Sequence, residues 1–213
     1  MNKVKIAVIG GTGKSGKYLV KELIKQGFLL KILIRDPNKF QNNSSQVELV
    51  VGDATNFSHV NSLISGCQAV ISTLGMGIPS SEPIIFSQST SNVIQAMNKQ
   101  GIHRYIVTTG LNVDAPFDKK GPNSLFATDW MRNNYPVSTA NKQLEHDILT
   151  QSDIDWTLVR LPLIEQSDEN GEVAISLEDC PGDKVSATDL AIFLIDQLSN
   201  KAYIRQSPFI SSV

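Results

Sequence analysis

Short apolar runs alternate along this chain with segments whose apolar residues recur at helical spacing. An apolar run at 4–9 ends in glycines, the apolar residues of 18–24 then follow a helical period, and a second apolar run occupies 29–34. Further strands are expected at 47–51, 69–73, 105–109, 156–161, 173–176 and 209–210, and further helices at 60–64, 84–97, 143–149 and 188–198. Because the strands are short and scarcely alternate between apolar and polar residues, they suit a parallel sheet covered by helices on both faces. The pattern therefore predicts an α/β fold with a doubly wound parallel sheet and right-handed crossovers.

The stretch 111–138 interrupts this alternation. It mixes aromatic residues with Pro, Asp, Asn and Lys, and it follows the carboxyl end of an expected strand, where folds of this class bind their ligands. Loops of this length are uncommon in compact domains and are often functional. We therefore predict an irregular loop on the substrate side of a single domain, residues 1–213, with at least one aromatic side chain in contact with substrate. The alternative is that these side chains only anchor the loop to the body of the protein.

Composition and charge limit the classes of function. Apolar residues make up 41% and charged residues 19% of the 213 residues, as in average globular domains, and the net charge of -2 gives no general attraction to nucleic acid or to an anionic membrane. Cys67, Cys180 and the histidines at 59, 103 and 146 lack metal-ligand spacing, so free thiols and no metal site are expected. Neither a run of about 20 apolar residues nor an export signal is visible, which predicts a cytoplasmic protein.

Three glycines of the sequence GGTGKSG, at 10–16, are spaced as GxxGxxG between the first expected strand and the first helix. Glycine permits a tight turn, lets backbone N–H groups approach a pyrophosphate, and allows the helix to pack closely on the strand, while the helix N-terminus supplies partial positive charge. The residues expected to contact a dinucleotide here are Gly10, Thr12, Gly13, Lys14, Ser15 and Gly16. A purely structural turn is the alternative. A P-loop is excluded, because no glycine lies five residues before Gly13.

The end of the second strand carries the residue that distinguishes NADP from NAD. An acidic side chain at this place binds the ribose 2′-hydroxyl of NAD, whereas an arginine accommodates the 2′-phosphate of NADP. Arg35 follows the strand directly, and Lys39 adds a second positive charge. The guanidinium suits bidentate contact with a phosphate. We therefore expect NADP as the cofactor, although the adjacent Asp36 favours NAD.

The turn GGTGKSG, the strand end IRDPNKF, the later segments VVGDATN and STLG, and the stretch KQLEHDILTQSDIDWTLVRLP occur together in this chain. With them the whole chain resembles the atypical short-chain dehydrogenase/reductases, and it is most similar to their NmrA-like and flavin reductase (biliverdin IXβ reductase)-like branch. The resemblance implies a Rossmann-type NAD(P)-binding domain with a small C-terminal substrate region. It also implies pyrophosphate contacts from the glycine turn and 2′-phosphate contacts from Arg35 and Lys39. It implies further that Asp53 and Ala54 border the adenine. Thr73, Leu74 and Gly75 would lie along the nicotinamide ribose, and Thr108 and Thr109 would lie beneath the nicotinamide.

The chain departs from the classical family at the catalytic pair YxxxK, in which the tyrosine is the general acid and base and the lysine holds the nicotinamide ribose. Lys142 matches the lysine, but Ser138 stands at the tyrosine position. Tyr135 lies about one helical turn too early to replace it directly. The flavin reductase branch commonly has a serine after the fifth strand, and the nearest residue here is Thr109. Thr109 and Lys142 are therefore the candidate catalytic residues.

Hydride transfer to a flavin or another conjugated acceptor needs little acid–base machinery, because solvent supplies the proton and the protein aligns two rings. We therefore expect an NADPH-dependent oxidoreductase of a small aromatic, flavin-like or quinone-like acceptor. The expected substrate contacts are Met76, Phe117, Phe126, Trp130, Tyr135 and Leu163. A non-enzymatic NmrA-like NADP(H)-binding redox sensor with a protein partner is the main alternative. A sugar-nucleotide epimerase or dehydratase is less favoured, since that class usually has YxxxK and a larger C-terminal lobe.

Overall fold

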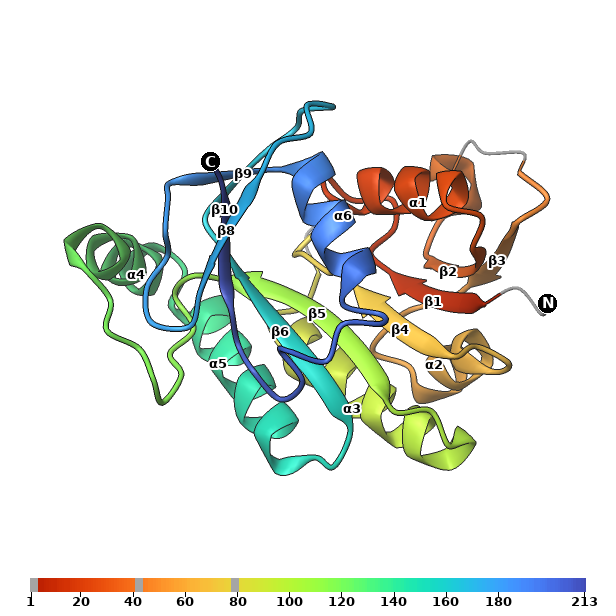
Figure 1. Ribbon diagram of the computed structural model, residues 1–213. Coiled ribbons are helices and arrows are strands. Elements are labelled where there is room, and N and C mark those ends of the chain that lie inside the picture. The colour runs from red at the N-terminus through yellow and green to blue at the C-terminus, as the bar shows by residue number, and fades with distance from the viewer. Residues whose placement is uncertain (1–3, 41–43, 78–80) are drawn as a thin grey trace.

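The computed structural model describes residues 4–40, 44–77 and 81–213. They form an eight-stranded sheet with helices on both faces and a separate two-stranded sheet (Figure 1). The strands of the larger sheet, in spatial order, are β3 (Val47–Val51), β2 (Leu29–Ile34), β1 (Lys5–Ile9), β4 (Ala69–Ser72), β5 (Arg104–Gly110), β6 (Asp155–Leu161), β10 (Phe209–Ser212) and β8 (Val173–Ser176). The smaller sheet consists of β7 (Leu163–Glu165) and β9 (Lys184–Ser186). The helices are α1 (Gly16–Lys25), α2 (Phe57–Ile64), α3 (Ile85–Gln100), α4 (Pro122–Asn134), α5 (Pro136–Gln151), α6 (Ala187–Asp196) and the short 3₁₀ helix η1 (Pro37–Lys39).

Neighbouring strands from β3 to β10 pair in parallel, and β8 runs antiparallel to β10 at one edge. The strand order reverses at β1, because the chain proceeds outward from β1 to β3 and then crosses back to β4 on the other side. At such a switch point the connections leave the two strands in opposite directions, which opens a crevice at their carboxyl ends where ligands bind. The doubly wound parallel sheet predicted from the apolar pattern is therefore confirmed, with one antiparallel edge strand in addition.

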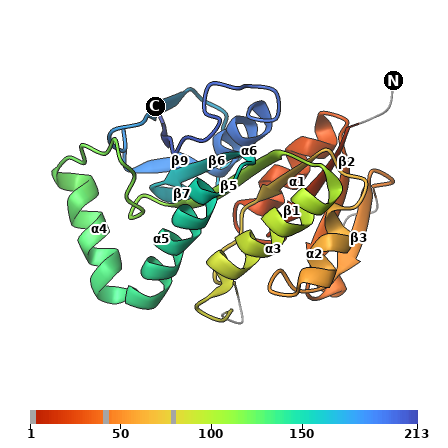
Figure 2. The ribbon, with the colours of Figure 1, turned by 90° about the horizontal axis from the view of Figure 1, so that it is seen from below.

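Two layers of buried apolar side chains lie on opposite faces of the sheet. Successive residues of β1 alternate between them: Ile6 and Val8 belong to one layer, and Ala7 and Ile9 belong to the other. The first layer is covered by α1 and α6, and the second by α2, α3 and α5 (Figures 1 and 2). This burial on both faces explains why the strands read as nearly continuous apolar runs. Among the helices in the described ranges, none has both the length and the apolar character needed to cross a membrane.

The segment 111–138 is not irregular throughout, so this prediction was wrong. Helix α4 occupies residues 122–134, and α5 begins at Pro136 instead of near residue 143. The short strands β7 and β9 were not predicted either. Each contains three residues, which is too few to show an alternation of apolar and polar positions.

Helix α4 escaped prediction because of the side chains that it buries. Its buried residues are Ser124 and Thr128, whereas Phe126 and Trp130 are exposed. A helix with a polar buried side and aromatic exposed residues has no apolar stripe of helical period for a sequence pattern to reveal. Its start does carry a recognisable signal, since Pro122 stands in the first helical turn, where the missing N–H has no intrahelical partner to lose.

A buried arginine ties the chain before α4 to the sheet. Arg160 of β6 is fully buried, and its Nη1 donates to both carboxylate oxygens of Asp118, at 2.6 and 2.8 Å. Its Nε donates to the carbonyl oxygen of Ser207 at 2.8 Å, and the guanidinium lies 3.5 Å from the centre of the Phe209 ring. Arg160 on β6 therefore links the segment before α4 to the chain that enters β10.

Candidate cofactor and active site

The glycine turn after β1 follows a backbone path that requires glycine at two positions. Gly10 has a φ of +79°, and a Cβ there would lie 2.7 Å from the carbonyl oxygen of Thr73. A Cβ on Gly16 would collide with the carbonyl oxygen of Gly10. Gly13 donates its N–H to that same oxygen at 2.9 Å and is exposed, so the absence of a side chain leaves the outer surface of the turn open.

The first amides of this turn have no acceptor within the described residues. The N–H groups of Thr12, Lys14 and Ser15 make no hydrogen bond there, whereas Lys17 donates to the carbonyl oxygen of Gly13 at 3.2 Å. These amides precede α1 and share the positive end of its dipole. Such an arrangement binds phosphate groups. The turn, at the switch point between β1 and β4, therefore fits the diphosphate of a dinucleotide.

Arg35 and Asp36, which follow β2, have different partners. Arg35 is exposed and donates from Nη1 to the hydroxyl of Ser81 at 3.2 Å. Asp36 accepts through Oδ1 from the backbone and side-chain amides of Asn38, both at 3.0 Å, and caps η1. Asp36 therefore has a local structural role, and the Arg35 guanidinium is the group presented at this strand end. Lys39, the last residue of η1, is exposed on the same turn.

Asp53 and Ala54, the predicted adenine border, form a turn after β3. The Asp53 Oδ1 atom accepts from the amide and the hydroxyl of Thr55, at 2.8 and 2.6 Å. Burial tends to raise the pKa of Asp53, but these hydrogen bonds and the charge of Arg35 together hold it below its ordinary value. Ala54 is buried, and its carbonyl oxygen accepts from Asn92 at 2.9 Å. Asp53 thus lies within electrostatic reach of Arg35, and its carboxylate has a turn-forming role of its own.

The loop after β4 starts beside the glycine turn. Thr73 is buried, and its hydroxyl lies 3.4 Å from the carbonyl oxygen of Gly10, to which it donates. Beyond it the chain becomes more accessible, with half-buried Leu74, exposed Gly75 and half-buried Met76. Thr108, on the next strand, is buried and donates to the carbonyl oxygen of Ser72 at 3.5 Å. The residues predicted along the nicotinamide half of the cofactor therefore share the carboxyl edge of β4 and β5.

Lys142 of α5 reaches the carboxyl end of β5. It is half-buried, and a Cβ placed on Gly110 would lie 3.5 Å from its Nζ atom. The Nζ atom also lies 5.1 Å from the centre of the Phe86 ring. Burial lowers the pKa of Lys142 below its ordinary value, and the charge of Glu145 opposes that shift. The structure thus places a cationic group at the strand end where the nicotinamide is expected.

The neighbours of Lys142 differ from those of a YxxxK pair. Ser138, one helical turn earlier, donates its hydroxyl to the carbonyl oxygen of Tyr135 at 3.4 Å. Tyr135 itself is exposed, and its ring meets that of Trp130 edge to face at 5.7 Å between centres. Thr109, at the end of β5, has a buried hydroxyl that lacks a hydrogen-bond partner among the described residues. Tyr135 therefore belongs to the corner between α4 and α5, and Lys142 and Thr109 remain the two candidate groups at β5.

Asn141 is a positioning residue that sequence reasoning missed. Its Oδ1 atom accepts from the backbone amides of Phe86 and Ser87, each at 3.1 Å, and its Nδ2 donates to the Ser87 hydroxyl at 2.7 Å. Helix α3 has no side-chain cap of its own at Ile84, so Asn141 supplies the cap from α5. Its partners lie 54 and 55 residues earlier in the chain, and no local motif reveals such a contact. The cap orients the part of α5 that carries Lys142.

The predicted substrate contacts other than Met76 lie on the outer surface. Their exposed fractions are 66% for Phe117, 73% for Phe126, 48% for Trp130, 53% for Tyr135 and 74% for Leu163. Helix α4, which carries two of them, packs against α5 at the end of the molecule opposite α2 and β3 (Figure 2). The structure does not gather these side chains with the glycine turn into one closed site. Their contact with substrate stays a prediction.

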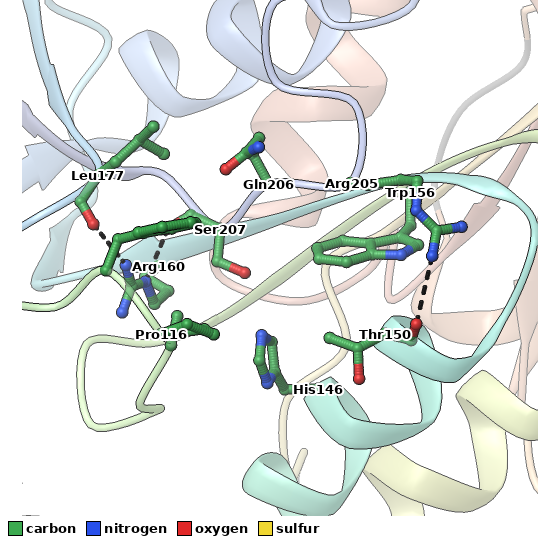
Figure 3. A pocket seen from close by; sticks show the side chains of 11 residues that line it. Pro116, His146, Thr150, Trp156, Arg160, Leu177, Arg205, Gln206 and Ser207 are labelled. Atoms are coloured by element: carbon green, nitrogen blue, oxygen red, sulfur yellow. Dashed lines mark hydrogen bonds between the residues drawn. The ribbon is translucent and has the colours of Figure 1, made fainter.

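A cavity of about 120 Å³ lies between α5 and β6, apart from the glycine turn (Figure 3). It is lined by residues 115–117, by His146 and Thr150 of α5, by Trp156 and Arg160 of β6, and by Leu177 and residues 205–207. Phe117 is the predicted substrate contact that lines it, and none of the predicted cofactor contacts does. Within the ranges that the structure describes, no three His, Cys, Asp or Glu side chains gather as metal ligands.

Comparison with known proteins agrees with this geometry. A family model described as NAD(P)H-binding matches residues 10–201. The chain is 27% identical over 186 residues to the uncharacterized chloroplastic protein At2g34460 of Arabidopsis thaliana, covering 82% of this chain and 64% of that protein. It is 32% identical over 136 residues to an isoflavone reductase homolog, A622-like, of Nicotiana tabacum, covering 59% of this chain and 41% of that protein. The chain thus spans less than two thirds of the length of these relatives.

Solved structures share the fold over nearly the whole chain. The oxidoreductase YlbE from Lactococcus lactis superimposes with a TM-score of 0.80 at 17% identity, covering 99% of this chain and 91% of that one. A short-chain dehydrogenase/reductase from Veillonella parvula, solved in complex with NADP, gives a TM-score of 0.80 at 14% identity and covers 98% and 94%. At these identities the likeness establishes the fold, in agreement with the doubly wound sheet.

Proposed function

Because this chain belongs to the NAD(P)H-binding family, we propose that it is an NADPH-dependent oxidoreductase that transfers hydride to a small flat acceptor. The acceptor would be aromatic, flavin-like or quinone-like. Membership in the family accounts for a nicotinamide cofactor and for the resemblance to short-chain dehydrogenase/reductases. The preference for NADPH, the oxidoreductase activity and the class of acceptor are the proposal.

The observation that carries the proposal is that Arg35 and Asp36, which follow β2, differ in their contacts. Asp36 is engaged in capping η1, so it is not presented as the carboxylate that would bind the 2′-hydroxyl of NAD. Arg35 is exposed beside it and close enough to Asp53 to lower that residue's pKa. A 2′-phosphate at this edge would receive charge-assisted hydrogen bonds from the guanidinium. The NADP bound by the relative from Veillonella parvula supports the same choice.

The side chains at the other end of the crevice support a simple redox step. NADPH, when bound, supplies a hydride. The amides of the glycine turn would hold its diphosphate, and the Lys142 ammonium would donate to hydroxyl groups at the nicotinamide end. Ser138 stands at the tyrosine position and donates its hydroxyl to the carbonyl oxygen of Tyr135, so the tyrosine that is the general acid of the classical pair is missing from its usual place. Acceptors that take their proton from water are therefore favoured.

Incubating the protein with NADPH and a panel of flavins and quinones, and following NADPH oxidation, tests the proposal. We expect turnover with at least one acceptor and a lower rate with NADH at equal concentration. A matched Gly13→Val variant should be inactive while its circular dichroism spectrum is retained. Saturable NADPH binding without oxidation by any acceptor would contradict the oxidoreductase assignment.

Ser138 in place of the catalytic tyrosine also favours a second function, a non-enzymatic redox sensor that passes the cofactor's state to a protein partner. A sensor must distinguish NADPH from NADP⁺ by affinity, since a ligand shifts a protein only through differential binding. Titrating both forms separates the two functions. A strong difference in affinity without turnover supports the sensor, and turnover supports the oxidoreductase.

A further inference from the structure

The cavity between α5 and β6 has walls that are largely apolar and aromatic (Figure 3). Pro116 and Phe117 line it from the segment before α4, Trp156 lines it from β6, and Leu177 lines it from the chain after β8. Trp156 is buried, whereas Pro116 and Phe117 are exposed and therefore lie where the cavity meets solvent. Its volume of about 120 Å³ is close to that of an apolar protein cavity of about 150 Å³ that binds benzene. The cavity thus has the size and the walls for one aromatic ring.

His146 brings an unpartnered polar group to this cavity. The residue is 5% exposed, and its imidazole points from α5 toward β6, into the space between Arg160 and Trp156 (Figure 3). The Nδ1 atom lies 3.7 Å from a carboxylate oxygen of Asp147 and has no hydrogen-bond partner among the described residues. The Nε2 atom, at the end of the ring farther from the helix, makes no hydrogen bond within the described ranges either. Buried polar groups are normally hydrogen-bonded, so this nitrogen indicates a ligand with a polar group of its own.

The charge state of His146 determines which group that is. Burial lowers the pKa of His146 below its ordinary value, the charge of Asp147 opposes that shift, and the charge of Arg160 adds to it. A neutral imidazole has one N–H donor and one acceptor nitrogen. The carboxylate near Nδ1 favours the tautomer that carries its proton there, which leaves Nε2 as the acceptor. A ligand that meets Nε2 must therefore donate a hydrogen bond.

The two arginines that line the cavity have their acceptors elsewhere. Arg160 is paired with Asp118 and also donates to three backbone carbonyl oxygens. Arg205 donates to the carbonyl oxygens of Ser152 and Thr150, at 2.6 and 3.2 Å, near the end of α5. An anion would have to compete with these acceptors and would lose its hydration against apolar walls. The site therefore favours a neutral ligand.

We propose that the cavity between α5 and β6 is a second binding site, which takes a small neutral phenol whose hydroxyl donates to the Nε2 atom of His146. The ring of the phenol packs against Trp156 and Phe117. None of the predicted cofactor contacts lines the cavity, so the site goes beyond the proposed function and does not depend on it.

Phenol, toluene and benzoate, each titrated into the protein at neutral pH without cofactor, test the chemistry of the site. Toluene has a methyl group in place of the hydroxyl, and benzoate carries a charge. We expect saturable binding of phenol with a Kd on the order of 1 mM, and binding of benzoate at least about tenfold weaker, measured by ligand-observed NMR. No saturable binding of phenol, or tighter binding of benzoate, would overturn the proposal.

His146→Leu removes the acceptor from the cavity wall and keeps a side chain of similar size. We expect it to weaken the binding of phenol about two- to tenfold, as for the loss of a neutral hydrogen bond, and to leave toluene unaffected. His103→Leu is the matched control, because it removes an exposed imidazole that does not line the cavity. Equal effects on phenol and toluene in folded His146→Leu would exclude the hydrogen bond to Nε2.

Thr150→Trp tests the location of the site and also covers the case in which His146→Leu does not fold. Thr150 is exposed, lines the cavity and lies one helical turn after His146 on the same face of α5. Side chains on a helix lean toward its N-terminus, so a tryptophan there should cover the cavity and abolish the binding of phenol. Gln151→Trp adds the same side chain at an exposed position outside the cavity and should bind phenol as the wild type does. Undiminished binding by folded Thr150→Trp would overturn the proposal.

A titration of phenol with and without saturating NADPH separates this site from the proposed function. We expect phenol and NADPH to bind together. If phenol binds but NADPH does not, the proposed function fails and the second site stands. If NADPH excludes phenol competitively, phenol occupies the cofactor crevice and the second site is overturned.

Discussion

At the end of β2, Arg35 is exposed, whereas the adjacent Asp36 is engaged by Asn38. Two adjacent residues of α5 also differ in their contacts: Asn141 caps α3, and Lys142 reaches the end of β5. Sequence motifs identified Arg35 and Lys142 as candidate site residues, because a motif specifies a position relative to strands and helices. They did not show that Asp36 would be used locally, and they did not reveal Asn141, because its partners come from a distant helix. Roles that depend on long-range contacts need the three-dimensional structure.

Arg35→Ala should abolish the preference for NADPH. The variant loses a charge-assisted interaction with the 2′-phosphate that has no counterpart in NADH, and such bonds contribute roughly 1.5–3 kcal/mol, or about ten- to hundredfold in affinity. The lower end is expected if Lys39 retains part of the contact. Calorimetric titration of both cofactors into both proteins measures the effect. Equal losses for NADPH and NADH would remove Arg35 as the discriminating residue.

Lys142→Ala should weaken NADPH binding or slow turnover by about tenfold, because the variant loses the cation at the end of β5. Asp147→Ala is the matched control, since Asp147 lies on the exposed side of the same helix. Gln143 is a less suitable control, because it exchanges hydrogen bonds with the backbone of Asp114 at 2.9 and 3.2 Å. Similar affinities and rates in Lys142→Ala and Asp147→Ala would reduce Lys142 to a surface residue.

Among the helices and strands, those that bury an apolar face were predictable and α4 was not. The apolar runs of β2 and β3 have the same limits in the structure as in the prediction, although β2 is buried from Leu30 to Ile34 and β3, at the edge of the sheet, is partly exposed. Helix α4 buries Ser124 and Thr128, and the loop before it is held by the charged contact between Arg160 and Asp118. Neither the polar buried side of α4 nor the ion pair produces a hydrophobic periodicity in the sequence. The aromatic residues of 111–138 were therefore identified as candidates without the helix that carries Phe126 and Trp130.

Asp118→Ala should destabilise the fold strongly. It leaves the Arg160 guanidinium, whose side chain is 1% exposed, without its carboxylate partner, and breaking a buried ion pair typically costs about 3–5 kcal/mol. Asp129→Ala is the control: Asp129 forms an exposed ion pair with Arg132 at 3.6 Å, which should contribute less than about 1 kcal/mol. Urea unfolding of the three proteins measures the free energies. A loss in Asp118→Ala no larger than in Asp129→Ala would show that Arg160 does not hold this segment.

For the whole molecule, the order of the strands brings distant segments to one crevice. The glycine turn follows β1, Thr73 follows β4, and Lys142 approaches the end of β5 from α5. The alternation of strands and helices predicted this arrangement, because parallel strands joined by right-handed crossovers leave few alternative topologies. The small sheet of β7 and β9 and the cavity beside β6 could not be predicted, since both depend on how the C-terminal third of the chain packs.

The central claim is that the turn after β1 binds NADPH, and a titration of NADPH into the wild type and Gly13→Val tests it most directly. Gly13 is exposed, and a Cβ there would lie 3.2 Å from the carbonyl oxygen of Gly10, so the fold should tolerate the substitution with a small adjustment. The larger side chain would cover the free amides that face the diphosphate. We expect saturable NADPH binding to the wild type and none to a variant whose unfolding midpoint is nearly unchanged. Equal NADPH affinity in the two proteins would contradict the claim.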